Sequence, residues 1–83
     1  MVERIRVLYF AHSREAAGKQ SETVLLAGPT TVRELLEQMV RSHPGLGELR
    51  PSLRLSVNRV LAEDGVSLHD GDEVAVLPPV AGG

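Results

Sequence analysis

The sequence contains no cysteine among its 83 residues. Disulfide bonds, a thiolate nucleophile, cysteine-ligated metals and iron–sulfur clusters are therefore excluded for this chain. Aromatic residues are also scarce, because Tyr9 and Phe10 are the only two. General nucleic-acid binding needs a basic surface and aromatic side chains that stack on bases, whereas the formal net charge here is −2. We therefore expect no nucleic-acid partner.

Long hydrophobic runs are missing as well. No apolar stretch approaches the ~18 residues of a membrane-spanning helix, and the first residues alternate apolar and charged side chains, unlike a signal peptide. We therefore expect no membrane partner and a cytoplasmic location. A chain of this length predicts one domain with a modest core, better suited to working with partner proteins than to holding a deep active site.

The apolar pattern predicts an α+β fold with the element order β-β-α-β-β-β. Alternating side chains predict strands over 2–10, 20–27, 53–57, 60–62 and 73–77. Loops that contain a short helical turn are expected between the first two strands and over 46–52.

One amphipathic helix stands between the second and third strands. From Val32 onward, apolar residues recur at i, i+3, i+4, i+7 and i+8, which is typical of a helix with one buried face. Thr31 is followed by Glu34 at the spacing of a capping box. Pro44 ends the helix, because a proline disfavours helical geometry in the residue before it.

The second face of the sheet is predicted to carry apolar side chains that the helix does not cover. If Val74, Val76 and the odd-numbered residues of the first strand face the helix, the opposite face gathers another set: Leu8, Phe10, Ala75 and Leu77. In a small chain, an exposed apolar patch of this kind is a candidate contact surface.

Charge is unevenly distributed along the chain. No lysine or arginine follows Arg59, whereas eleven positions contain five acidic residues: Glu63, Asp64, Asp70, Asp72 and Glu73. The run is either an ordinary solvated surface or an acidic patch that attracts a basic partner, and both readings stay open. The three histidines share no metal-ligand spacing, so we expect no metal site.

The last six residues carry the most chemical information. Pro78 and Pro79 end the last strand and favour an extended path, over which residues 78–83 can reach about 20 Å. We expect residues 1–77 to form the domain and residues 78–83 a flexible functional tail that inserts its carboxylate into a partner. Joined to AMP, that carboxylate becomes an electrophile, and glycine leaves its carbonyl open from both faces.

Several segments together resemble a known family. They are the opening strand over 5–11, residues 14–18, the helix start at Thr31, the Val57-Asn58 pair and, most specifically, the run over 68–83. In these segments the chain resembles the small, sulfur-carrier subunit of molybdopterin synthase, within the ubiquitin-like β-grasp superfamily. The resemblance implies a mixed sheet of four to five strands, with one main helix packed on one face and an extended Gly-Gly tail.

The resemblance also implies a mechanism centred on Gly83. An adenylyltransferase of the ubiquitin-activating type would consume ATP to adenylate Gly83, and a persulfide donor would convert it to a thiocarboxylate. Sulfur would then pass to cyclic pyranopterin monophosphate to form the molybdopterin dithiolene. No cofactor would be bound stably by this chain. The inserted segment would comprise Pro78, Pro79, Val80, Ala81, Gly82 and Gly83.

The partner implied by the resemblance is the large subunit of the synthase, which would supply the catalytic side chains in a heterotetramer. Phe10, Leu61 and Leu77 would form the apolar contact with it. Other hypotheses remain: a β-grasp sulfur carrier for thiamine thiazole, tRNA thiolation or cysteine synthesis, a ubiquitin-like protein modifier, or an interaction domain with an inert tail. Phe10 and the run over 78–80 favour molybdopterin.

Overall fold

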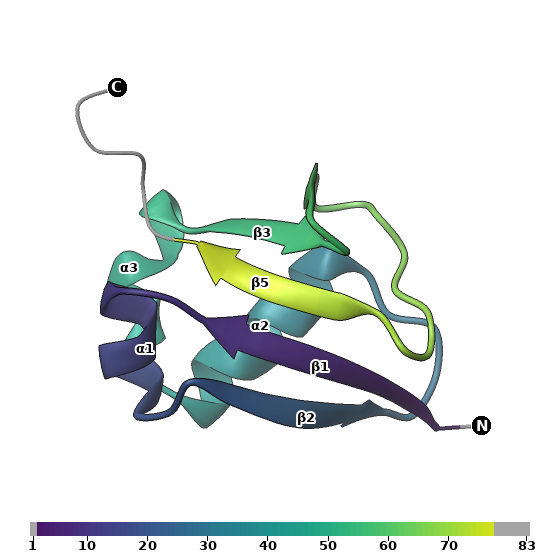
Figure 1. The fold of residues 1–83 in the computed structure, drawn as a ribbon, viewed down its shortest axis with the longest axis horizontal. Coiled ribbons are helices and arrows are strands. Elements are labelled where there is room, and N and C mark those ends of the chain that lie inside the picture. Colours follow the sequence, from purple (N-terminus) through teal and green to yellow (C-terminus); the bar gives the residue numbers. More distant parts are fainter. Residues whose placement is uncertain (1, 78–83) are drawn as a thin grey trace.

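The computed structural model describes residues 2–77 and contains one mixed five-stranded sheet (Figure 1). In chain order the elements are β1 (Glu3–Tyr9), α1 (His12–Ala17), β2 (Ser21–Leu26), α2 (Val32–Ser42), α3 (Leu46–Leu49), the 3₁₀ turn η1 (Arg50–Ser52), β3 (Arg54–Val57), β4 (Val60–Ala62) and β5 (Glu73–Leu77). The strand order is β2-β1-β5-β3-β4. The predicted α+β class and order of elements are confirmed.

The two strands from opposite ends of the sequence lie side by side at the centre of the sheet. β1 and β5 pair in parallel, with Tyr9 opposite Val76, whereas every other neighbouring pair is antiparallel. Figure 1 shows the two strands pointing the same way, with α2 crossing behind them. The sheet therefore has one face under α2 and one face that no other element between residues 2 and 77 crosses.

Helix α2 begins at the predicted capping box. The Thr31 hydroxyl accepts a hydrogen bond from the Glu34 N–H at 3.2 Å, and the Glu34 carboxylate accepts one from the Thr31 N–H at 2.9 Å. Both interactions satisfy N–H groups that a helix start leaves without intrahelical partners. At the other end, the His43 N–H donates to the Met39 carbonyl at 2.8 Å.

The core lies between α2 and the sheet face that it covers. Its innermost side chains are almost fully buried and come from β1, β5, α2 and α3: Ile5, Val7, Tyr9, Val32, Leu35, Met39, Leu46, Val74 and Val76. Burial of each large aliphatic side chain stabilises the fold by about 1.5–3 kcal/mol. No helix within residues 2–77 is long and apolar enough to cross a membrane.

The strand boundaries differ from the predicted ones by a residue or so, and one difference has a clear cause. Leu53 was expected to begin the third strand, but its N–H donates to the Arg50 carbonyl at 3.2 Å and closes η1. That bond takes the N–H out of the strand ladder, so β3 begins at Arg54. The helical turns expected over 11–19 and 46–52 are confirmed as α1 and as α3 with η1.

Candidate functional site: the root of the tail and the open sheet face

The predicted tail, residues 78–83 including the reacting Gly83, lies outside the described residues, but its root is well defined. β5 ends at Leu77 and is paired with β1 as far as Val76 and with β3 as far as Leu77. Val76 lies opposite Tyr9 of β1, and Leu77 lies opposite Arg54 of β3. The tail therefore starts from a central strand held by two neighbours.

A buried serine ties the ends of the two central strands together. The Ser13 side chain is fully buried and its Oγ accepts a hydrogen bond from the Phe10 N–H at 3.0 Å. The same hydroxyl lies 2.7 Å from the Phe10 carbonyl oxygen and 3.2 Å from the Val76 carbonyl oxygen, either of which can accept its proton. Ser13 thus links the residue after β1 to the penultimate residue of β5, a role the sequence did not signal.

The turn that places Ser13 has an unusual backbone. Ala11, between β1 and α1, adopts φ 50° and ψ −126°, a region that favours glycine. The conformation is held by the Ser13 and Arg14 N–H groups, which donate to the carbonyls of Phe10 and Ala11 at 3.1 and 3.0 Å. The chain therefore turns sharply beside the tail root.

The sheet face opposite α2 carries a row of three apolar side chains and one serine, called the apolar row below. Four residues that point to this face are register neighbours across four strands, namely Leu8, Ala75, Ser56 and Leu61 in that order. The expected apolar second face is thus present, and Leu61 extends it to the edge strand β4. The next row toward the start of β1 is charged, with Arg6 opposite Glu73.

The three residues predicted to contact a partner are accessible from this open face. Phe10 is 38% exposed, Leu61 is 63% exposed and Leu77 is partly buried. Leu77 points away from the core because its neighbour Val76 is fully buried within it. Large apolar side chains left this exposed are typical of a protein-contact surface, although partner binding itself stays a prediction.

Part of the acidic run serves the turn before β5 rather than a partner. Asp72 accepts hydrogen bonds from the Asn58 side-chain amide at 2.9 Å and from the His69 N–H at 2.8 Å. Asp70 accepts one from the Arg4 N–H at 2.6 Å. Asn58, with φ 51°, occupies the tight turn predicted between β3 and β4, and its side-chain oxygen accepts from the Glu73 N–H at 3.0 Å. These bonds fix where β5 starts.

A polar cluster that the sequence did not reveal joins β1, β2 and the end of α2. The Tyr9 hydroxyl donates to Glu22 Oε2 at 2.5 Å, and His43 Nε2 lies 2.7 Å from the same oxygen. Burial, followed by the hydrogen bond to Glu22 and its negative charge, raises the pKa of Tyr9. Burial also acts to raise the pKa of Glu22, but hydrogen bonds from Tyr9 and His43 and the charges of His43 and Lys19 outweigh it, so that this pKa is lowered.

The lowered pKa of Glu22 predicts an acid-dependent loss of stability. A carboxyl group whose pKa is lower in the folded chain stabilises the fold above its unfolded pKa, about 4.3, and that stabilisation is lost as the pH falls through the folded value. We expect Glu22→Gln to cost about 1–2 kcal/mol at pH 7 and progressively less below pH 4. Urea unfolding from pH 7 to pH 2.5 measures the difference, with Glu15→Gln on the exposed face of α1 as control. Parallel pH curves for wild type and Glu22→Gln would contradict the expectation.

No group of three or more histidine, aspartate or glutamate side chains suited to a metal ion occurs within residues 2–77. The histidines instead approach single carboxylates, as His12 does Glu15 at 3.8 Å and His69 does Asp72 at 3.9 Å.

The strand order and the Gly-Gly sequence that follows β5 define the class of the protein. It is a ubiquitin-like β-grasp domain whose last strand is central and leads into that sequence. Comparison with known families gives the more particular assignment. The family model described as the ThiS family matches residues 7–83, and the chain belongs to that family.

Curated relatives cover almost the whole chain. It is 40% identical over 82 residues to the molybdopterin synthase sulfur carrier subunit of Chlamydomonas reinhardtii, covering 96% of this chain and 99% of that protein. It is 36% identical over 83 residues to the human protein of the same name, covering 96% and 94%. The resemblance seen in the sequence is confirmed.

Solved structures confirm the fold. A putative molybdopterin converting factor subunit 1 from Pyrococcus furiosus has a TM-score of 0.86 at 30% identity, covering 94% of this chain and 99% of that chain. SAMP1 of Haloferax volcanii has a TM-score of 0.81 at 33% identity, covering 96% and 99%. A complex of subunits 1 and 2 of the molybdopterin-converting factor from Helicobacter pylori contains a chain with a TM-score of 0.66 at 26% identity, covering 96% and 99%.

Proposed function

We propose that this chain is the sulfur carrier subunit of a cytoplasmic molybdopterin synthase. The observation that supports this most directly is the similarity to relatives of that name over 96% of the chain. The family match also extends to residue 83. The open face and the central position of β5 fit a protein that docks on a partner while presenting its C-terminus.

In the proposed cycle, the reacting group is the carboxylate of Gly83. The carboxylate attacks the α-phosphorus of ATP on an activating adenylyltransferase, and pyrophosphate leaves. The terminal sulfur of a persulfide donor then displaces AMP and forms an acyl disulfide. A thiol reductant cleaves the S–S bond of this intermediate, which releases the thiocarboxylate and leaves a disulfide between the thiol and the donor. Because the chain has no cysteine, it cannot carry sulfur as a persulfide. The carrier is therefore a carboxylate, and we assign this role to the C-terminal one.

The second half of the cycle takes place on the large subunit. The tail, residues 78–83, inserts there and delivers sulfur to cyclic pyranopterin monophosphate, while Phe10, Leu61 and Leu77 bind the surface around the entrance. The Helicobacter pylori complex of subunits 1 and 2 supports a large-subunit partner. The chain binds the large subunit and positions the sulfur at the end of its tail. The catalytic side chains belong to the large subunit of a heterotetramer.

The proposal is tested by the intact mass of the purified chain after incubation with the activating enzyme, ATP, a persulfide donor and a thiol reductant. We expect a gain equal to the exchange of one oxygen for one sulfur, located by fragmentation at Gly83. Adding the large subunit and cyclic pyranopterin monophosphate should return the original mass and yield molybdopterin. A sulfurated chain that yields no molybdopterin, while it supplies a thiazole-forming or tRNA-thiolating enzyme, would reassign the pathway.

A second candidate function is supported by the similarity to SAMP1, which is described as a small archaeal modifier protein. As a protein modifier, the chain would form an amide bond between Gly83 and a lysine of another protein. The same activated chain distinguishes the two functions: conjugates in place of molybdopterin would favour the modifier. Both functions use the Gly83 carboxylate, so they differ in the partner protein that the contact face binds.

A further inference from the structure

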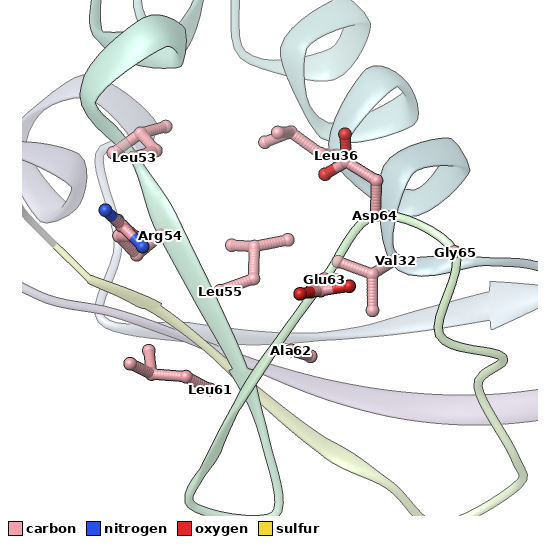
Figure 2. A pocket seen from close by; sticks show the side chains of 10 residues that line it. All are labelled: Val32, Leu36, Leu53, Arg54, Leu55, Leu61, Ala62, Glu63, Asp64 and Gly65. Carbon is pink, nitrogen blue, oxygen red and sulfur yellow. The ribbon is translucent and has the colours of Figure 1, made fainter.

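An open groove lies at the edge of the sheet, between the start of α2 and strands β3 and β4. Its volume is about 720 Å³ and Figure 2 shows the side chains around it. The lining exposes both apolar and polar atoms and comprises Val32, Leu36, Leu53, Arg54, Leu55, Leu61, Ala62, Glu63, Asp64 and Gly65. The groove arises because β4 has only three residues and leaves the flank of α2 partly uncovered.

Two carboxylates give the groove a negative rim. Glu63 and Asp64 follow β4 directly and are exposed, and neither forms an ion pair within residues 2–77. The only basic side chain in the lining is Arg54. Figure 2 shows that Arg54 and Leu55 project from opposite sides of β3. Glu63 and Asp64 are the two residues of the acidic run that stand apart from the turn before β5, so they are available to a partner.

The loop that carries this rim is held firmly against the helix. The Val32 N–H donates to the Val66 carbonyl at 2.9 Å, and the Arg33 N–H donates to the Asp64 carbonyl at 3.0 Å. The loop is anchored further on by the Leu68 N–H, which donates to the Thr30 carbonyl at 2.9 Å. A groove whose walls are already joined by hydrogen bonds loses little conformational entropy when it binds a ligand.

The geometry also suits an extended peptide. β4 is the last strand of the sheet, and its outer backbone groups have no strand partner within residues 2–77. An exposed strand edge next to a groove that contains apolar side chains can accept an added strand, in which alternate side chains enter the groove. Leu61 is shared between the groove and the apolar row of the open face, so the two surfaces are continuous.

We propose that this groove binds an extended segment of the large subunit, with apolar side chains against Leu36 and Leu55 and a lysine or arginine facing Glu63 and Asp64. The inference rests on the proposed function, because it extends the same interface around the sheet edge. The large subunit is the expected partner because Leu61 joins the groove to the open face that would contact it. The segment is expected to be basic because the two carboxylates have no ion pair within residues 2–77.

Calorimetric titration of the purified chain with the large subunit tests the proposal. The variant carries Glu63→Lys and Asp64→Lys, and the control carries Glu15→Lys and Glu48→Lys, which produce the same change in net charge at exposed sites outside the groove. We expect the groove variant to bind at least about tenfold more weakly than the control, with a smaller dependence on salt. Equal affinities would overturn the proposal.

Amide hydrogen exchange gives a second measurement that does not depend on a variant. In the complex of wild-type chain and large subunit, we expect exchange to slow over residues 60–66 as well as at the open face. Protection of the open face alone would overturn the groove proposal and leave the proposed function intact. Failure of the proposed function would appear separately, as a chain that acquires no sulfur at Gly83.

Discussion

Deletion of Gly83 alone is expected to abolish sulfur transfer while the domain stays folded. The deletion moves the terminal carboxylate back by one residue, or up to about 3.6 Å along an extended chain. A reacting group displaced by even 1 Å can lose about 100-fold in rate. We therefore expect molybdopterin formation at background level, measured with the activating enzyme, the persulfide donor and the large subunit.

The matched control for this deletion is Gly83→Ala, which keeps the chain length and the carboxylate but adds a Cβ beside the reacting carbonyl. We expect it to retain a reduced rate, since glycine alone leaves both faces of the carbonyl open. The thermal unfolding midpoint should be the same for wild type and both variants, because the buried core residues all lie between Ile5 and Val76. Full activity of the deletion variant would show that the terminal carboxylate is not the carrier.

Replacement of Phe10 by aspartate is expected to produce the largest loss of affinity for the large subunit. Phe10 is 38% exposed beside the tail root, so aspartate is tolerated in the free chain. In the complex, the same carboxylate would be buried against an apolar surface without a partner, which costs about 3–5 kcal/mol. That cost corresponds to a loss of roughly 100-fold or more in affinity.

The control for Phe10→Asp is Leu25→Asp. Leu25 is 59% exposed on the same face of the sheet, but it lies opposite Arg4 near the start of β1, at the far end from the tail root. We expect Leu25→Asp to bind the large subunit with unchanged affinity. Similar losses for both variants would indicate a general effect of charge on this face rather than a contact at Phe10.

The secondary structure was predictable because its signals are local. The apolar spacing of α2, the Thr31–Glu34 capping box and the Asn58-Arg59 turn each depend on residues close together in the sequence. The open face was predictable too, because side chains alternate along a strand. Leu53 was misplaced since a 3₁₀ turn and the first residue of a strand look alike in an apolar pattern.

The polar contacts between distant segments could not be predicted. His43 meets Glu22 across 21 positions, and Ser13 meets Val76 across 63. No periodicity marks such pairs, because they form only once the sheet order has brought their strands together. The groove was equally hidden, since it arises from a short β4 and not from a motif.

The position of β5 also links the completion of folding to the presence of the reactive end. β5, residues 73–77, is synthesised after the other four strands but lies between β1 and β3, so the sheet cannot close until these residues have left the ribosome. A chain that terminates early loses the middle of its sheet together with its C-terminus. We expect such a fragment to fail to fold, so that it would not compete with sulfur-loaded copies for a partner. The strand order thereby acts as a check that every folded copy has been translated at least to the root of the tail.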